Sequence, residues 1–192
     1  MKLNGSYQIN LEKQKVWEAL NNPEILRQSI PGCDEFKKNS DTEFTATATN
    51  KIGPFNASFT GDIELSDLKP PDSYKISGSG NSPVGFASGE ATVRLEDQDG
   101  GTNLIYEVEA NVGGKIAQVG SRLIDMTAKK MADIFFGKFS ELISTEESSS
   151  SEDQSKEKID QTISTKPKKQ YQKTLIYAAV AVAVAILIYS FL

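Results

Sequence analysis

Between residues 44 and 112, apolar side chains recur at every second position in five successive segments, and this period most constrains the fold. A period of two places the apolar residues of each segment on one face of an extended strand. The segments span residues 44–48, 55–65, 74–78, 87–95 and 104–112. Turn signals separate them at Gly53-Pro54, Pro70-Pro71 and Gly100-Gly101. The pattern therefore predicts an antiparallel sheet with one buried face.

Helical patterns lie on both sides of these segments. We predict a first strand at residues 3–9, a helix at residues 12–20 and a second short helix that begins at Pro23. Residues 115–143 return to helical spacing, with one side formed by Ala117, Gly120, Ile124, Ala128, Met131, Phe135, Phe139 and Leu142. This order predicts an α+β fold of the helix-grip type, in which an antiparallel β-sheet wraps around a long C-terminal α-helix.

Composition divides the chain into three parts. Residues 1–144 mix apolar and charged residues as a globular domain does, and we interpret them as one helix-grip ligand-binding domain. Residues 145–172 lack hydrophobic periodicity and are rich in Ser, Glu and Lys, which predicts a disordered charged linker. Residues 173–192 are predicted to form a single C-terminal transmembrane anchor.

The anchor prediction rests on the uncharged run over residues 175–192. Eighteen helical residues rise about 27 Å, close to the roughly 30 Å hydrocarbon thickness of a bilayer. Lysines precede the run and none follows it, so the positive-inside rule places the globular domain in the cytoplasm, tethered to the cell membrane. A buried core helix is the alternative, but a terminal apolar helix that follows a polar linker has no neighbouring core to pack into. The anchor residues singled out are Leu175, Ile176, Tyr177, Ile186, Leu187, Ile188 and Tyr189.

The side-chain inventory limits the chemistry. The chain has no His and one Cys, so it offers no imidazole or thiolate set for a metal and no His-activated nucleophile. We therefore predict no catalytic residue, no metal site and no covalent or metal cofactor. A net charge of -5 argues against nucleic acid as a partner. Cys33 has no adjacent Lys or Arg to lower its pKa, which favours an inert thiol.

The inward strand faces combine many small residues with aromatic ones, and small inward residues leave volume. One interpretation is a cavity between sheet and helix that suits a flat apolar ligand. The alternative is that the glycines supply sheet curvature and the helix fills the space. The candidate cavity-lining residues are Phe44, Phe55, Phe59, Tyr74, Phe86, Tyr106, Ile124, Met131 and Phe135. Phe86 is out of phase with Ala87 and Gly89, so it is also a candidate for an entrance loop.

Several short segments together resemble one family. They are Val16-Trp17 with Asn22-Pro23, Ile30-Pro31-Gly32-Cys33, Ile52-Gly53-Pro54-Phe55 followed by Phe59-Thr60-Gly61, and the run from Gln118 to Ile124 before Phe135-Phe136. The combination resembles the G subunit of carbon monoxide dehydrogenase (CoxG), a family within the START/polyketide-cyclase-like (SRPBCC) helix-grip superfamily. The resemblance covers nearly all of residues 1–144.

The resemblance implies an accessory protein for molybdenum-containing hydroxylases of the carbon monoxide dehydrogenase type, rather than an enzyme. It also implies membrane recruitment of the oxidoreductase and transport of a hydrophobic ligand, a quinone or another isoprenoid lipid. A tethered carrier would collect this ligand at the membrane and present it to its partner. The alternative is a ligand-free structural adaptor that docks the oxidoreductase at the membrane. A third function, an enzyme such as a cyclase, needs a general acid or base inside the cavity, where the inward faces offer only Tyr74 and Tyr106.

Overall fold

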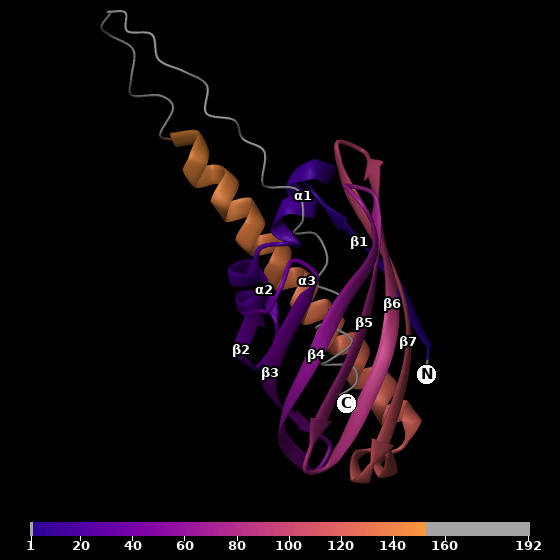
Figure 1. The fold of residues 1–192 in the computed structure, drawn as a ribbon. Coiled ribbons are helices and arrows are strands. Elements are labelled where there is room, and N and C mark those ends of the chain that lie inside the picture. The colour runs from indigo at the N-terminus through magenta and orange to yellow at the C-terminus, as the bar shows by residue number, and fades with distance from the viewer. Residues whose placement is uncertain (1, 153–192) are drawn as a thin grey trace, which may run out of the picture.

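The computed structural model describes residues 2–152 and confirms the α+β architecture. Seven strands, six of them predicted, and the predicted long final helix dominate it (Figure 1). In chain order the elements are β1 (Lys2–Ile9), α1 (Lys13–Ala19), α2 (Pro23–Ser29), β2 (Cys33–Lys38), β3 (Glu43–Ile52), β4 (Phe55–Lys69), β5 (Ser73–Ser82), β6 (Gly85–Gln98), β7 (Gly101–Gly114), the 3-10 helix η1 (Lys115–Val119) and α3 (Ser121–Glu152).

The seven strands form one antiparallel sheet in the order β1-β7-β6-β5-β4-β3-β2. Neighbours from β2 to β7 follow one another in sequence, while β1 pairs with β7 and completes the sheet at the far edge. Figure 1 shows the strands curving around α3, which lies along the inner side of the sheet. The hydrophobic core therefore sits between the inner sheet face and α3, with α1 and α2 covering one end.

Small residues meet in the middle of the inner sheet face. Gly78 on β5 pairs with Gly89 on β6, and Gly89 pairs with Ala110 on β7. A methyl group at Gly89 would lie 2.7 Å from the carbonyl oxygen of Glu109, so the backbones approach too closely for a side chain there. Glycine at these paired positions permits the strong bend that the sheet needs to wrap around a helix.

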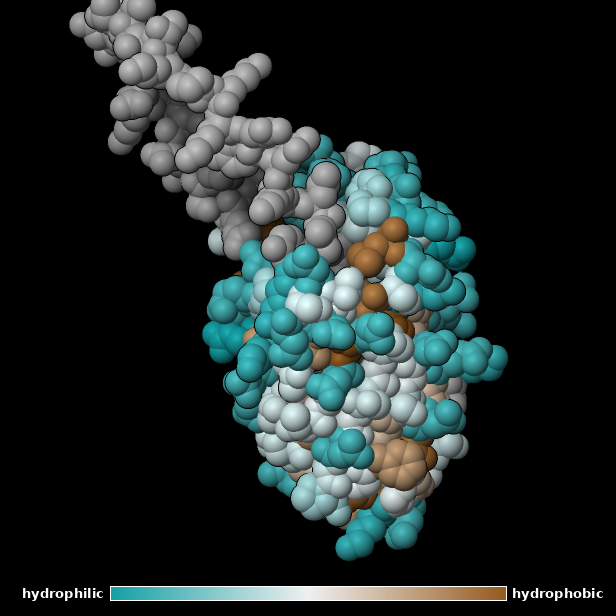
Figure 2. Space-filling model, in the orientation of Figure 1, coloured by the Kyte–Doolittle hydropathy of each residue, from teal (hydrophilic) through white to brown (hydrophobic). Residues whose placement is uncertain are grey.

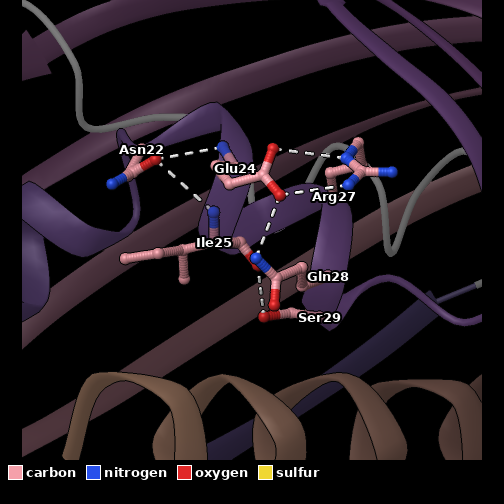
Figure 3. Close-up of polar contacts among 6 residues, drawn as sticks. All are labelled: Asn22, Glu24, Ile25, Arg27, Gln28 and Ser29. Atoms are coloured by element: carbon pink, nitrogen blue, oxygen red, sulfur yellow. Dashed lines mark hydrogen bonds and ion pairs between the residues drawn. The ribbon is translucent and has the colours of Figure 1, made fainter. Parts of the chain in front are cut away.

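The second short helix begins at the predicted proline because its N-terminus is capped. The Asn22 side-chain oxygen accepts hydrogen bonds from the backbone N–H groups of Glu24 and Ile25, at 3.0 and 3.4 Å (Figure 3). Glu24 in turn accepts from Arg27 and Gln28 on the exposed side. The buried side of α2 packs against α3. The Asn22 cap therefore stabilises a helix that covers one end of the core.

Two elements differ from the predictions. Strand β2 was missed because only one of its side chains, Phe36, is buried, and its remaining residues give no clear alternation. The helix predicted over residues 115–143 is divided at Gly120, whose φ of 89° is incompatible with an α-helix. α3 then continues through Glu152, beyond the predicted end at residue 143. Hydroxyls of Ser144 and Thr145 donate to carbonyls four residues earlier along this extension.

The predicted membrane anchor, including all seven residues named for it, lies outside the described residues, as does most of the predicted linker. Within residues 2–152, no helix combines the length and the apolar character that a membrane span requires.

Substituting Gly5 is expected to destabilise the fold, because β1 places it directly against an aromatic ring. A methyl group at Gly5 would lie 2.5 Å from the Tyr106 hydroxyl oxygen, and the Tyr106 ring is held by Phe136, whose centroid is 5.6 Å away. Gly5→Ala should lower the free energy of unfolding by about 1–3 kcal/mol. Urea titration followed by circular dichroism measures this change.

Gly137→Ala is the matched control. Gly137 lies inside α3 with no atom within 4 Å of an added methyl group, so alanine should stabilise the helix by about 0.5–1 kcal/mol. Equal destabilisation by the two substitutions would contradict this account of Gly5.

Candidate functional site

The structure brings most of the predicted lining residues together in the core between sheet and helix. Six are buried: Phe44, Phe59, Tyr74, Tyr106, Ile124 and Phe135. Four of these rings, at positions 44, 59, 74 and 135, expose only 1% of their surface. Phe55 and Met131 are half-buried against the same core. The rings are therefore surrounded by protein atoms, and the interior is closely packed where they lie.

Phe86 does not line this interior, which corrects the prediction for that residue. It is 52% exposed and pairs with Gly113 across β6 and β7. Its ring covers Gly113, where a methyl group would lie 2.3 Å from the Phe86 Cζ atom. The period of two explains the placement, because Phe86 shares the outward phase of Ser88 and Glu90. It also belongs to a strand, not to an entrance loop.

An aromatic group joins the first strand to the last helix. Tyr7 on β1 stacks on Phe136 of α3 with ring centroids 4.1 Å apart, and Tyr106 on β7 lies 5.6 Å from the same ring. The Tyr7 hydroxyl donates a hydrogen bond to an Asp133 side-chain oxygen. Sequence reasoning missed Tyr7, Phe136 and Asp133 as a group, because Tyr7 and the helix are far apart in sequence and Phe136 lies beside the apolar stripe that was followed.

Tyr74 is enclosed in the interior, with 1% of its surface exposed. Its ring meets the edge of Trp17 on α1, with centroids 5.6 Å apart. Its hydroxyl is buried and has no hydrogen-bond partner among the described residues. A buried hydroxyl without a partner costs about 1–3 kcal/mol, so this position favours any group that could accept its proton in a hydrogen bond.

The interior phenols are hydrogen-bonding groups and not acids at neutral pH. Burial raises the pKa of Tyr74 and of Tyr106 above the usual value for tyrosine. The pKa of Tyr7 is also raised, first by burial and then by its hydrogen bond to Asp133. All three therefore stay protonated at physiological pH, and their chemistry in the core is to orient neighbours or a neutral ligand.

The outer face of the sheet is polar and hollowed. One hollow of about 580 Å³ is lined by residues that include Lys2, Ser77, Glu90 and Glu109. Such a surface suits water and polar partners better than an apolar ligand. Among the described residues, His, Cys, Asp and Glu side chains form no group of three that could hold a metal ion.

Comparison with known proteins identifies relatives of this domain. A family model that describes the G subunit of carbon monoxide dehydrogenase (CoxG) matches residues 5–144. The solved structure of a conserved protein from Geobacillus kaustophilus is 31% identical, with 76% of this chain and 96% of that chain covered and a TM-score of 0.72. No curated protein matches.

More distant solved structures share the fold alone. An uncharacterized protein from Rhizobium leguminosarum is 15% identical, with 76% of this chain and 95% of that chain covered and a TM-score of 0.58. A protein from Thermus thermophilus is 10% identical, with 76% of this chain and 98% of that chain covered and a TM-score of 0.59. The architecture is thus retained where most of the sequence has changed.

Cys33 should react slowly with alkylating reagents. Burial raises the pKa of its thiol to about 11, so the thiolate is about one part in a thousand at pH 8. Alkylation by iodoacetamide, followed by mass spectrometry, should therefore accelerate about tenfold per pH unit between pH 8 and 10. The urea-unfolded chain is the control, with a thiol pKa near the ordinary value of about 8.5. A rate in the folded protein that levels off near pH 9 would contradict the prediction.

Tyr74→Phe should stabilise the protein, because it removes a buried hydroxyl that has no partner among the described residues. We expect a gain of about 1 kcal/mol in the free energy of unfolding, measured by urea titration. Tyr7→Phe is the matched control. Its hydroxyl donates a hydrogen bond to Asp133, so its loss should destabilise by about 1 kcal/mol. A large destabilisation by Tyr74→Phe would mean that the hydroxyl has a partner.

Proposed function

Because this chain belongs to the CoxG family of carbon monoxide dehydrogenase accessory proteins, we propose that it is a membrane-tethered accessory protein for an oxidoreductase of the molybdenum hydroxylase type. The observation that carries the proposal is the match over residues 5–144, which spans the sheet except for the first three residues of β1 and includes the part of α3 that packs on it. The family is one of accessory rather than catalytic subunits, with association to carbon monoxide dehydrogenase at the family level.

The tether is supported by the sequence. The uncharged run at residues 175–192 and the lysines at positions 166, 168, 169 and 173 fit an anchor that leaves the domain in the cytoplasm. A tether keeps the domain, and anything bound to it, at a high effective concentration beside the bilayer. Recruitment of a soluble enzyme to the membrane then needs only a modest affinity between domain and enzyme.

Two versions of this role differ in what happens inside the domain. The close packing of the rings at positions 44, 59, 74 and 135 supports an adaptor that docks the enzyme and carries no ligand of its own. The unpartnered Tyr74 hydroxyl supports a carrier of a hydrophobic ligand with an acceptor oxygen, and a quinone is such a ligand. Its carbonyl would take the hydrogen bond that Tyr74 lacks among the described residues. The carrier version also requires the packed rings to move apart when the ligand enters.

Purification of the full chain from its own membranes tests the role and separates the two versions. A tagged chain should retain a molybdenum hydroxylase in the membrane fraction, and deletion of residues 173–192 should release both proteins into the soluble fraction. An enzyme that stays in the membrane fraction when the chain is absent would contradict the proposed role.

Native mass spectrometry with lipid extraction on the same sample tests the carrier version. A carrier should hold about one quinone per chain, and Tyr74→Phe should weaken that binding about tenfold while leaving the enzyme attached. An adaptor should hold none, even after incubation with a quinone. Equal quinone binding by the parent and Tyr74→Phe would remove Tyr74 from the carrier version.

A further inference from the structure

Exposed apolar side chains gather at one end of the domain. This strand-tip end consists of the tip of the β3–β4 hairpin (residues 51–55), the tip of the β5–β6 hairpin (82–86), η1 and the first turns of α3 (121–126). Among the described residues, the exposed large hydrophobic side chains are Phe86, Met126 and Ile134, and the first two lie at this end, 52% and 62% exposed. Half-buried Phe55, Val84, Val119 and Leu123 accompany them.

The four segments touch one another and form one continuous surface. A methyl group at Gly53 would lie 3.3 Å from Leu123 Cδ2 and 3.5 Å from Val119 Cγ1, so the β3–β4 turn rests on η1 and α3. The backbone N–H of Ile116 donates to the Val84 carbonyl at 3.0 Å, which joins η1 to the β5–β6 turn. Figure 2 shows brown and tan surface at this end, which is lowest in the view.

Charge separates along the length of the domain. The strand-tip end carries Lys51, Lys115 and Arg122, all exposed and without an ion-pair partner among the described residues, against one carboxylate, Asp125. The strand ends and turns at the opposite end carry the carboxylates Asp41, Asp67, Asp72, Glu96, Asp97 and Asp99 together with the four lysines Lys13, Lys38, Lys69 and Lys75. Ion pairs join Lys13 to Asp72 and Asp97, Lys38 to Asp41, and Lys75 to Asp67. Carboxylates outnumber lysines there, so the domain has a basic, partly apolar end and a more acidic end.

We propose that the strand-tip end is a docking surface for an anionic lipid bilayer. Exposed apolar side chains ringed by cations are what a protein needs to sit in a headgroup layer, with the apolar groups below the cations. Phe86 and Met126 enter the interfacial region, and Lys51, Lys115 and Arg122 contact lipid phosphates. The acidic end then faces away from the membrane, because anionic lipids repel it.

The chain outside the described residues is long enough for this orientation. α3 runs away from the strand-tip end, and its 32 residues rise about 48 Å. The 22 residues 153–174 span at most about 75 Å when extended, so the chain can return along the domain to the same bilayer. This geometry rests on the proposed membrane tether.

Site-specific labelling of the full chain in vesicles tests the orientation. Phe86→Cys, Met126→Cys and, at the opposite end, Gln98→Cys are each made with Cys33→Ser and labelled with a nitrobenzoxadiazole dye. In vesicles with about 30% phosphatidylglycerol, dyes at 86 and 126 should shift to the blue and be quenched by headgroup-proximal spin-labelled lipid. The dye at 98 should stay unquenched. Equal quenching at all three positions, or at none, would overturn the proposal.

Charge reversal provides a second test. Lys51→Glu, Lys115→Glu and Arg122→Glu together should reduce quenching at 126 at least fivefold, since each cation near an anionic surface strengthens binding about fivefold. Lys37→Glu, Lys69→Glu and Lys138→Glu change the net charge equally and should have less than a twofold effect. Thermal unfolding of both triple variants verifies that they fold. Equal effects of the two triples would overturn a specific role for the strand-tip end.

Vesicle flotation separates this proposal from the tether on which it rests. A full chain that fails to float with vesicles refutes the tether. A chain that floats while its dyes at 86 and 126 stay unquenched refutes lipid docking alone. Dyes that shift only when carbon monoxide dehydrogenase is added also refute it, in favour of a protein partner at this end.

Discussion

The contact between β1 and α3 joins the first strand of the domain to its last helix. Tyr7 stacks on Phe136 and donates its hydroxyl proton to Asp133 in a hydrogen bond, 126 positions further along the chain. Tyr106 adds a third ring from β7, the strand that pairs with β1. This group fixes α3 against the sheet edge at which the strand order does not follow the sequence. It thereby holds the edge strand β1 against the core that also contains Phe44 and Phe139.

The sheet could be predicted because its residues obey a local rule. Period-two alternation in β3 to β7 reflects one buried and one solvated face, and the turn signals at Gly53 and Gly100 coincide with positive φ angles. Strand β2 follows no such rule, since Phe36 is its one buried side chain. It exists because β3 offers an edge to pair with, which is a tertiary cause.

The site was predictable only where strand phase decides burial. Phase correctly placed Phe44, Phe59, Tyr74 and Tyr106 in the interior, and it also explains why Phe86 is outside. Whether the interior is open or filled depends on how closely α3 approaches, and the sequence carries no local signal for that distance. Local sequence patterns also give no signal for the hydrogen bond between Tyr7 and Asp133. They did not predict the helix break at Gly120 either, because the apolar spacing continues through that residue.

Strand β2 leaves one edge of the sheet without a strand neighbour among the described residues, and its sequence suits that position. A register shift between Cys33 and Glu35 interrupts the ladder, and Lys37 and Lys38 place charges along the edge. Domains tethered to one bilayer meet at far higher local concentration than domains in solution. An edge strand that disfavours pairing with a further strand allows such domains to be crowded on a surface without joining their sheets edge to edge.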